Sequence, residues 1–347
     1  MPGRRRSRFV AVGPLLLLLA GCGTASVAGP PGTSAAAATR GNALHLVANA
    51  TSVDSTLEFL TQSAGIFAKN GLNVTLDGMS GQASMDALIA GHVDAVAHSG
   101  PQTDLSAIAG GAQLKIVGTL LSVYNTIIVA PSSITSLDQL RGKKVGGQSA
   151  LGTNVQGMRR ALQNAGLKEG TDYTFVSTGN SAGTQGAYAA LVAHQIDAAP
   201  LDDQYARKAV ADGTFHALLD LASPEANISS AFTLLTFRQE YIQQHPDLTQ
   251  KAVDSLMEGV RYLHDHKAET EALMKSHSKI DDPVELEASY QRQVLILSKA
   301  PLPTKEQFDD VLATMPKDAP KISESQLVSY LEPRFVQDAI KRGLADY

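Results

Sequence analysis

Apolar and polar positions alternate along the body of the chain in a pattern that predicts strands and helices in turn. Three short apolar segments predict strands: residues 43–50, 72–76 and 93–97. Between the first two, apolar residues recur at helical spacing: Leu57, Leu60, Ala64 and Phe67. A second helix is predicted through Met85 and Leu88. The order strand–helix–strand–helix–strand requires a parallel sheet with right-handed crossovers.

The same order of elements recurs from residue 144 to residue 198. The predicted helices of the two copies both open with a capping-box sequence, at 55–58 and 153–156. The second helix has the apolar offsets of the first: Val155, Met158, Leu162 and Ala165. Residues 190–198, ALVAHQIDA, also repeat the pattern of residues 87–95, ALIAGHVDA. Chance similarity between generic βαβ units is the alternative, but two related α/β lobes explain the repeat more simply.

Two apolar segments connect the predicted lobes. Residues 124–131 leave the first lobe and residues 232–237 return to it, and two extended connections between two lobes predict a hinge. The first lobe is predicted to comprise 43–129 plus 235–347, and the second 130–234. The fold class is therefore α/β, in which each lobe is a mainly parallel sheet flanked by helices. After residue 238 the pattern is helical, which predicts a C-terminal extension that packs on the first lobe.

The N-terminus has the features of a secretory signal. Residues 4–8 are basic, and the apolar run 9–20 is too short to remain as a membrane-spanning helix. The run ends in Leu19-Ala20-Gly21-Cys22, which resembles a bacterial lipobox. Such a signal is cut before the cysteine, and the thiol then carries lipid; the alternative is a buried core cysteine. We predict a signal peptide at 1–21, lipidation of Cys22 and a flexible tether at 22–42, rich in Gly, Ala, Ser, Thr and Pro.

Composition narrows the function classes. The 347 residues carry 29 basic and 34 acidic side chains, and loss of the signal removes four arginines and no acid. The acidic balance argues against a nucleic-acid partner. The single cysteine excludes an internal disulfide and a zinc site of several thiolates. With no tryptophan and 5% aromatic residues, a carbohydrate-stacking surface is not expected. Neither a cofactor nor a metal is predicted, because His264 and His266 cannot converge on one helix face and His277 stands apart.

Three segments carry a family resemblance: residues 64–72 (AGIFAKNGL), 87–95 (ALIAGHVDA) and 136–146 (SLDQLRGKKVG). In order and spacing the chain resembles the type II periplasmic solute-binding proteins of ABC importers. It looks most like the branch that serves sulfonates, nitrate, taurine and thiamine-pyrimidine precursors. The resemblance implies a two-lobed type II fold and capture of a small solute between the lobes. It further implies delivery to a membrane permease by an extracytoplasmic monomer, held at the periplasmic or outer face of the cell membrane.

Topology predicts where a ligand would bind. In open parallel sheets, ligands lie beyond the carboxyl ends of the strands, and two such edges would face one cleft. Candidate ligand-binding residues at these ends are Ser52, Ser80, Gly81, Gln82, His98, Ser99, Tyr124, Ser149, Gly152, Thr153 and Asp202. Structural alternatives are an N-cap for Thr153, a turn for Ser80 and Gly81, close packing for Gly152, a core role for His98 and Tyr124, and a capping or solvated carboxylate for Asp202.

The ligand class stays open at this stage. None of the predicted cleft loops carries Arg or Lys, so amines, pyrimidine-like compounds and aromatic acids stand beside sulfonates. We expect a binding protein rather than an enzyme. The enzyme alternative is a pyrimidine synthase of thiamine formation, which shares the fold, but the cysteine-rich motif of that group is absent here. A third alternative is a surface lipoprotein that senses a ligand.

Overall fold

The computed structural model describes residues 41–48, 55–79, 82–148, 152–179, 184–313, 315 and 319–347. The predicted signal peptide 1–21, Cys22 and all of the tether except 41 and 42 lie outside the described residues. Residues 42–347 form one compact unit. In the described parts of the chain, no helix combines the length and apolar character needed to cross a membrane.

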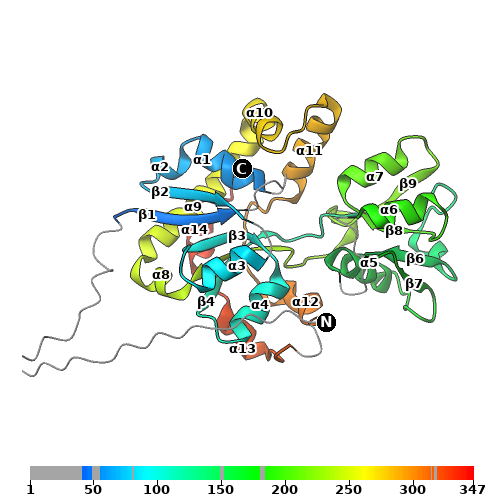
Figure 1. Cartoon of the computed structure of the whole chain (residues 1–347), viewed down its shortest axis with the longest axis horizontal. Coiled ribbons are helices and arrows are strands. Elements are labelled where there is room, and N and C mark those ends of the chain that lie inside the picture. The colour runs from blue at the N-terminus through cyan, green and yellow to red at the C-terminus, as the bar shows by residue number, and fades with distance from the viewer. Residues whose placement is uncertain are drawn as a thin grey trace, which may run out of the picture. The chain divides into compact units, whose positions relative to one another are not determined.

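Five strands form the sheet of the first lobe, in the order β2-β1-β3-β10-β4 (Figure 1). Their bounds are β1 (Ala43–Ala48), β2 (Asn73–Gly78), β3 (Ala95–Ser99), β4 (Leu114–Leu121) and β10 (Thr233–Arg238). β1 pairs in parallel with β2 and β3, whereas β10 runs antiparallel between β3 and β4. We call lobe one the part built from residues 43–121 and 233–347.

The second lobe repeats this strand order. Its strands are β5 (Ile127–Pro131), β6 (Lys144–Gly147), β7 (Thr174–Ser177), β8 (Ala199–Leu201) and β9 (Phe215–Asp220). β7 pairs with β6, a bridge from Val145 to Ala198 links β6 to β8, and β5 runs antiparallel between β8 and β9. The strands form a three-stranded sheet, β8-β5-β9, and a two-stranded sheet, β6-β7, which this isolated bridge joins. Taken across the bridge, the order β7-β6-β8-β5-β9 matches lobe one, with β5 in the place of β10. We call lobe two the part formed by residues 127–220.

Each antiparallel strand is the first strand after the chain has crossed between the lobes. β5 follows the crossing at 122–126, and β10 follows the crossing at 221–232. The sequence placed the start of β5 in the first lobe, but Ile127 pairs with Leu201 and Asp220 of lobe two. The chain therefore crosses before residue 127.

Helices cover both faces of each sheet, as parallel strands require. The neighbouring residues Leu46 and Val47 of β1 point into different hydrophobic clusters. Ile128 and Val129 of β5 are divided in the same way in lobe two. Lobe one has α1 (Thr56–Ser63), α2 (Ile66–Lys69), α3 (Gln82–Ile89) and α4 (Pro101–Ala109), and lobe two has η2 (Leu137–Leu140), α5 (Thr153–Asn164), α6 (Gln185–Val192) and α7 (Asp203–Val210).

The C-terminal helices pack on lobe one, as expected. Val253 and Leu256 of α9 share a core with Leu44 of β1 and Leu57 of α1. A 3-10 turn, η3 (Pro224–Ala226), lies in the second crossing. The remaining elements are α8 (Gln239–Gln244), α9 (Pro246–Asp265), α10 (Lys267–His277), α11 (Pro283–Ile296), η4 (Lys305–Phe308), α12 (Asp309–Ala313), α13 (Glu324–Tyr330) and α14 (Arg334–Lys341).

The internal repeat is confirmed at the level of hydrogen bonds. Asp94 accepts a bond from the backbone N–H of His45 at 2.9 Å, and Asp197 accepts the corresponding bond from Lys144 at 2.8 Å. Each aspartate therefore joins the third strand of its lobe to the first. Where Gly91 takes a left-handed φ of 75° in lobe one, His194 takes a φ of 54° in lobe two. The two βαβ copies thus share their turns as well as their strands.

The predicted capping boxes are wrong. Ser55 stands at the N-cap of α1 without a capping bond from its side chain, and Glu58 is buried beside His98 instead of reaching back to the N-cap. In α5 the N-cap is Gly152, and Thr153 is already the first helical residue. Tertiary contacts therefore override the local capping signal at Glu58.

Candidate functional site

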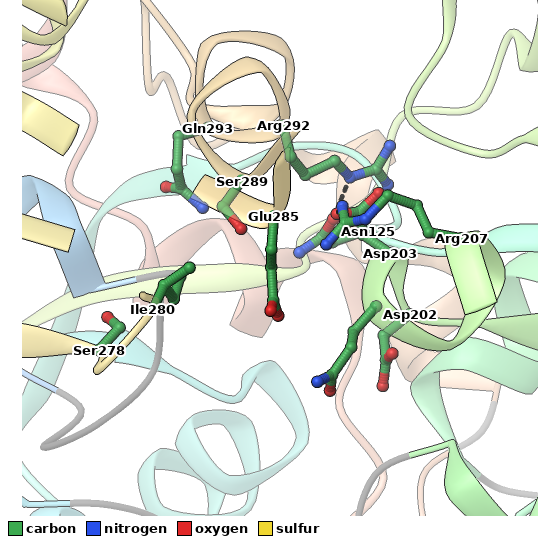
Figure 2. A pocket seen from close by; sticks show the side chains of 11 residues that line it. Asn125, Asp202, Asp203, Arg207, Ser278, Ile280, Glu285, Ser289, Arg292 and Gln293 are labelled. Atoms are coloured by element: carbon green, nitrogen blue, oxygen red, sulfur yellow. Dashed lines mark hydrogen bonds and ion pairs between the residues drawn. The ribbon is translucent and has the colours of Figure 1, made fainter. Parts of the chain in front are cut away.

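A cavity of about 390 Å³ lies between α7 of lobe two and α11 of lobe one (Figure 2). Residues from both lobes and from one crossing line it, so its shape depends on how the lobes are held. The lining residues are Asn125, Asp202, Asp203, Gln204, Arg207, Ser278, Ile280, Glu285, Ser289, Arg292 and Gln293.

The lobe-two wall is the first turn of α7. Asp202 caps this helix: one carboxylate oxygen accepts from the N–H of Tyr205 at 3.1 Å. The other accepts from the hydroxyl of Thr184 at 2.7 Å. Asp203 and Arg207 form an ion pair one helical turn apart. Asp202 therefore caps α7, which was the structural alternative for this residue, and it also lines the cavity.

The lobe-one wall is α11, which Asp282 caps through bonds from the N–H groups of Val284 and Glu285. Four residues of α11 share one face because their spacing follows the helical repeat: Glu285, Ser289, Arg292 and Gln293. From the sequence alone, a face of this kind on an amphipathic helix is expected either to be buried in the core or to be exposed to solvent. Here it faces the other lobe.

Arg292 is the most constrained side chain of the cavity. It is 7% exposed; its Nε donates to Asn125 Oδ1 at 2.5 Å and its Nη1 to Asp220 Oδ2 at 2.6 Å. Its Nη2 is buried without a hydrogen-bond partner among the described residues, as are Gln293 Oε1 and Ser278 Oγ. Buried polar groups are normally hydrogen-bonded, so these atoms are positions on the wall at which a ligand or a water can bond. All three residues line the same cavity.

The charged groups of the cavity share one electrostatic environment. Burial, the largest cause, lowers the pKa of Arg207, and the nearby Arg292 acts in the same direction. The carboxylates of Glu285 and Asp202 oppose this effect and raise the pKa of Arg207. Charges on α7 and α11 therefore act on each other across the space between the lobes.

A second hollow, of about 680 Å³, lies at another place between the lobes. It is lined by Arg160 of α5 and by Glu306 and Asp309 of the η4–α12 region, among others. Arg160 forms an ion pair with Asp310. Among the described residues, no side chain that lines this second hollow is a buried polar group without a hydrogen-bond partner. The first cavity is therefore the better candidate for a ligand site.

The sequence-predicted residues are distributed over both lobes, and among those that the structure describes only Asp202 lines the cavity. His98, the last residue but one of β3, has a left-handed φ of 59°, and its Nδ1 lies 3.0 Å from the buried carboxylate of Glu58. Ser99 donates to Asp104 at 2.7 Å. Gln82 begins α3 on the surface and donates to Asp86 at 2.8 Å. Ligand contact by these residues stays a prediction.

Tyr124 lies in the core at the first crossing. Its ring is 1% exposed and meets Phe232 edge-on at 6.1 Å, and its hydroxyl donates to Asp310 at 3.1 Å. Gly152 and Thr153 begin α5 and do not line the cavity. Four further candidates lie outside the described residues: Ser52, Ser80, Gly81 and Ser149.

Sequence reasoning missed both guanidinium groups of the cavity. Arg207 comes one turn after Asp203 on α7, so following the helix beyond the predicted strand end would have found it. Arg292 belongs to a helix 90 residues further along the chain, and no local sequence pattern predicts that it lies near Asp202. The predicted cleft loops lack Arg and Lys, and the cavity takes its two arginines from the helices α7 and α11 instead. Among the described residues, no group of three metal-ligating side chains is suitably placed to hold an ion.

Comparison of the sequence with known protein families identifies the family of this chain. Residues 52–270 match the family model described as NMT1/THI5 like. The chain belongs to the NMT1/THI5-like family. No curated protein matches this family member in sequence.

Solved structures share its fold at low sequence identity. The periplasmic aliphatic sulphonate binding protein SsuA from Escherichia coli is 21% identical, with a TM-score of 0.57 over 73% of this chain and 79% of that one. A putative periplasmic sulfonate-binding protein from Methylobacillus flagellatus is 17% identical, with a TM-score of 0.67 over 88% and 95%. The periplasmic nitrate-binding protein NrtA from Synechocystis is 13% identical, with a TM-score of 0.61 over 87% and 89%. The fold is that of periplasmic binding proteins, as the sequence predicted.

Proposed function

We propose that this chain is an extracytoplasmic substrate-binding protein that captures a small organic solute between its two lobes and delivers it to an ABC importer permease. In this proposal lipid on Cys22 holds the protein at the membrane, and the monomer is the working form. The fold and the family support the proposal, because the sulfonate- and nitrate-binding structures with the same fold are binding proteins.

The observation that carries the proposal is the placement of Arg292. Two of its nitrogens bond to Asp220 and Asn125, which lie where the chain passes between the lobes, and the third is buried at the cavity without a described partner. A ligand bonded to that nitrogen would touch α11 directly and, through Arg292, affect both crossings. Its affinity would then differ between lobe arrangements, which is the condition for a ligand to shift them.

A binding role fits the cavity better than a catalytic one. Its lining residues include neither a histidine nor a cysteine, so the two commonest partners of nucleophilic catalysis are absent from the described wall. The pyrimidine-synthase alternative therefore gains no support from this site. A sensor would use the same cavity, and reconstituted uptake with the permease separates it from the transport role.

Thermal stabilisation of the full chain across a panel of sulfonates, amines, pyrimidines and aromatic acids tests the proposal. A ligand at about 100 times its dissociation constant adds ~2.7 kcal/mol to the free energy of unfolding. We expect a stabilising ligand to change the distance between spin labels on α2 and α6. We also expect Arg292→Met to weaken binding by at least about tenfold. Arg261→Met, on the surface of α9, is the control. Tight binding that is unaffected by Arg292→Met and leaves the label distance unchanged contradicts the proposal.

A further inference from the structure

We infer that the ligand of this cavity carries a positively charged nitrogen and that Glu285 binds it. The inference rests on the proposed function and specifies its ligand class. It also distinguishes this chain from the sulfonate- and nitrate-binding structures that share its fold.

The first step is the balance of charge. Both guanidinium groups of the cavity already have carboxylate partners, because Arg207 pairs with Asp203 and Arg292 pairs with Asp220. Asp202 is occupied by its bonds from Thr184 and from the backbone of Tyr205. An anionic ligand would therefore meet two neutralised arginines and additional negative charge.

The second step is the state of Glu285. Its carboxylate lines the cavity and forms no hydrogen bond or ion pair with any of the residues that the structure describes. Figure 2 shows the side chain extending from α11 into the space between Ile280 and Asp202. Glu285 favours the charge of Arg207 without contacting it, whereas the other acidic groups of the cavity are engaged in direct bonds. Its oxygens are therefore the carboxylate oxygens of the cavity that are open to a ligand. An ammonium group is the natural partner of a carboxylate in a partly desolvated site.

The third step is the set of buried polar atoms that need a partner. Gln293 Oε1 accepts hydrogen bonds, whereas Arg292 Nη2 donates one. Gln293 and Glu285 lie on the same face of α11 about two helical turns apart, so they present two separate acceptors along one wall of the cavity. A protonated amine supplies the donors for Glu285, a second donor of the ligand or a water serves Gln293, and an acceptor elsewhere in the ligand receives the bond from Arg292. Amines and zwitterions with this arrangement match the cavity, whereas a simple anion leaves both acceptors unsatisfied.

Titration calorimetry with the full chain tests this inference. The probes are linear alkylamines, alkanesulfonates and aminoalkanesulfonates of matched chain length, measured at neutral pH. We expect the best amine-bearing compound to bind at least about tenfold more tightly than the sulfonate of the same length. Glu285→Gln should weaken binding of that compound by about tenfold or more, and leave the alkanesulfonate unchanged or tighter. Glu287→Gln is the matched control, because Glu287 lies on the same helix and pairs with Lys267 outside the cavity.

The outcomes separate this inference from the function on which it rests. Alkanesulfonates that bind as tightly as their amine-bearing counterparts overturn the ligand class, and so does Glu285→Gln with unchanged affinities. If binding still depends on Arg292 in that case, the proposed function stands and only the ligand class fails. If no probe binds, the ligand class fails, and the wider panel of sulfonates, amines, pyrimidines and aromatic acids decides the proposed function. If binding ignores both Glu285 and Arg292, the cavity is not the ligand site and both proposals fail. Glu285 is partly exposed, and far-ultraviolet circular dichroism checks that the variant is folded.

Discussion

The guanidinium of Arg292, on α11 of lobe one, lies 2.6 Å from the carboxylate of Asp220 at the end of β9 in lobe two. The same side chain bonds to Asn125, in the crossing that precedes β5. One residue of the C-terminal extension thereby contacts lobe two and both ends of the hinge region. The extension thus lines the cavity between the lobes as well as covering lobe one.

Replacing Arg292 should destabilise the protein. Arg292→Met leaves the carboxylate of Asp220 and the amide of Asn125 without their buried donor, a loss of about 1–3 kcal/mol in the free energy of unfolding. Urea unfolding measures the change. Arg261→Met removes an exposed i,i+4 pair with Asp265 and should stay within about 0.5 kcal/mol of wild type. Equal effects of the two substitutions would show that the contact with Asp220 contributes nothing.

Stability should fall with rising pH because of Asp104. Burial, the largest cause, raises the pKa of Asp104 to about 7, although hydrogen bonds from Thr236 and Ser99 act in the opposite direction. A group whose pKa is higher in the folded state stabilises the fold at low pH. That contribution is lost as the pH rises from about 4 to about 7, with a limiting slope of ~1.4 kcal/mol per pH unit.

Asp104→Asn removes this titration and keeps an oxygen for Thr236 and Ser99. The difference in free energy of unfolding between wild type and variant should therefore move in favour of the variant as pH rises from 4.5 to 7. Chemical denaturation at a series of pH values measures it. Asp86→Asn, at an exposed carboxylate of α3, should show no such trend. Parallel pH profiles for Asp104→Asn and wild type would contradict the prediction.

A second contact between the lobes should set the balance of lobe arrangements. Arg160 on α5 of lobe two forms an ion pair with Asp310 on α12 of lobe one, and Asp310 also accepts from Tyr124. We expect Arg160→Gln to broaden or shift the interlobe distance distribution, because this arrangement loses a charge-assisted contact. Electron spin resonance between labels on α2 and α6 measures it.

The neighbouring Arg159→Gln is a matched control. Arg159 pairs with Glu169 inside lobe two, so its loss should leave the interlobe distances unchanged. Exchange of the charges, Arg160→Asp with Asp310→Arg, should restore part of the wild-type distribution. Identical distributions for wild type and Arg160→Gln would rule out a role for this pair in setting the lobe arrangement.

Gly157 permits the packing of Tyr124 at the first crossing. A Cβ at position 157 would stand 2.6 Å from the Tyr124 ring, closer than any ordinary contact. An alanine inside a helix normally stabilises it by about 0.5–1 kcal/mol relative to glycine, but here we expect Gly157→Ala to destabilise by about 1–3 kcal/mol. Thermal or urea unfolding measures the sign. In a Tyr124→Ala background the penalty should disappear, and a penalty that persists there would assign it to another contact.

The proposed anchor at Cys22 predicts the cellular distribution of the protein. Wild type should be recovered with membranes and incorporate labelled fatty acid, whereas Cys22→Ala should do neither. Ser26→Ala, in the predicted tether, is the control and should behave as wild type. Recovery of Cys22→Ala in the membrane fraction at the wild-type level would show that another segment holds the protein there.

Several features of the fold could be read from the sequence because they depend on contacts close along the chain. The paired segments around Asp94 and Asp197 predicted two related lobes, and each aspartate makes the same bond to the first strand of its lobe. Helical periodicity placed α1, α5 and α9, because an amphipathic helix buries one stripe whatever lies opposite it. The parallel pairing of β1 with β2 and β3 followed from the predicted strand–helix–strand order, whereas the antiparallel places of β5 and β10 did not.

The tertiary structure alone decided the site. Glu58 has the spacing of a capping box but is buried against His98, because burial and long-range contacts outweigh a local capping bond. Asp202 was found from the strand end that precedes it. Its companions Glu285 and Arg292 reach the cavity only because α11 packs beside the hinge. The sequence by itself determined two α/β lobes and a hinge between them. Which charged side chains meet between the lobes was set by the packing of elements distant along the chain, and no local periodicity encodes that packing.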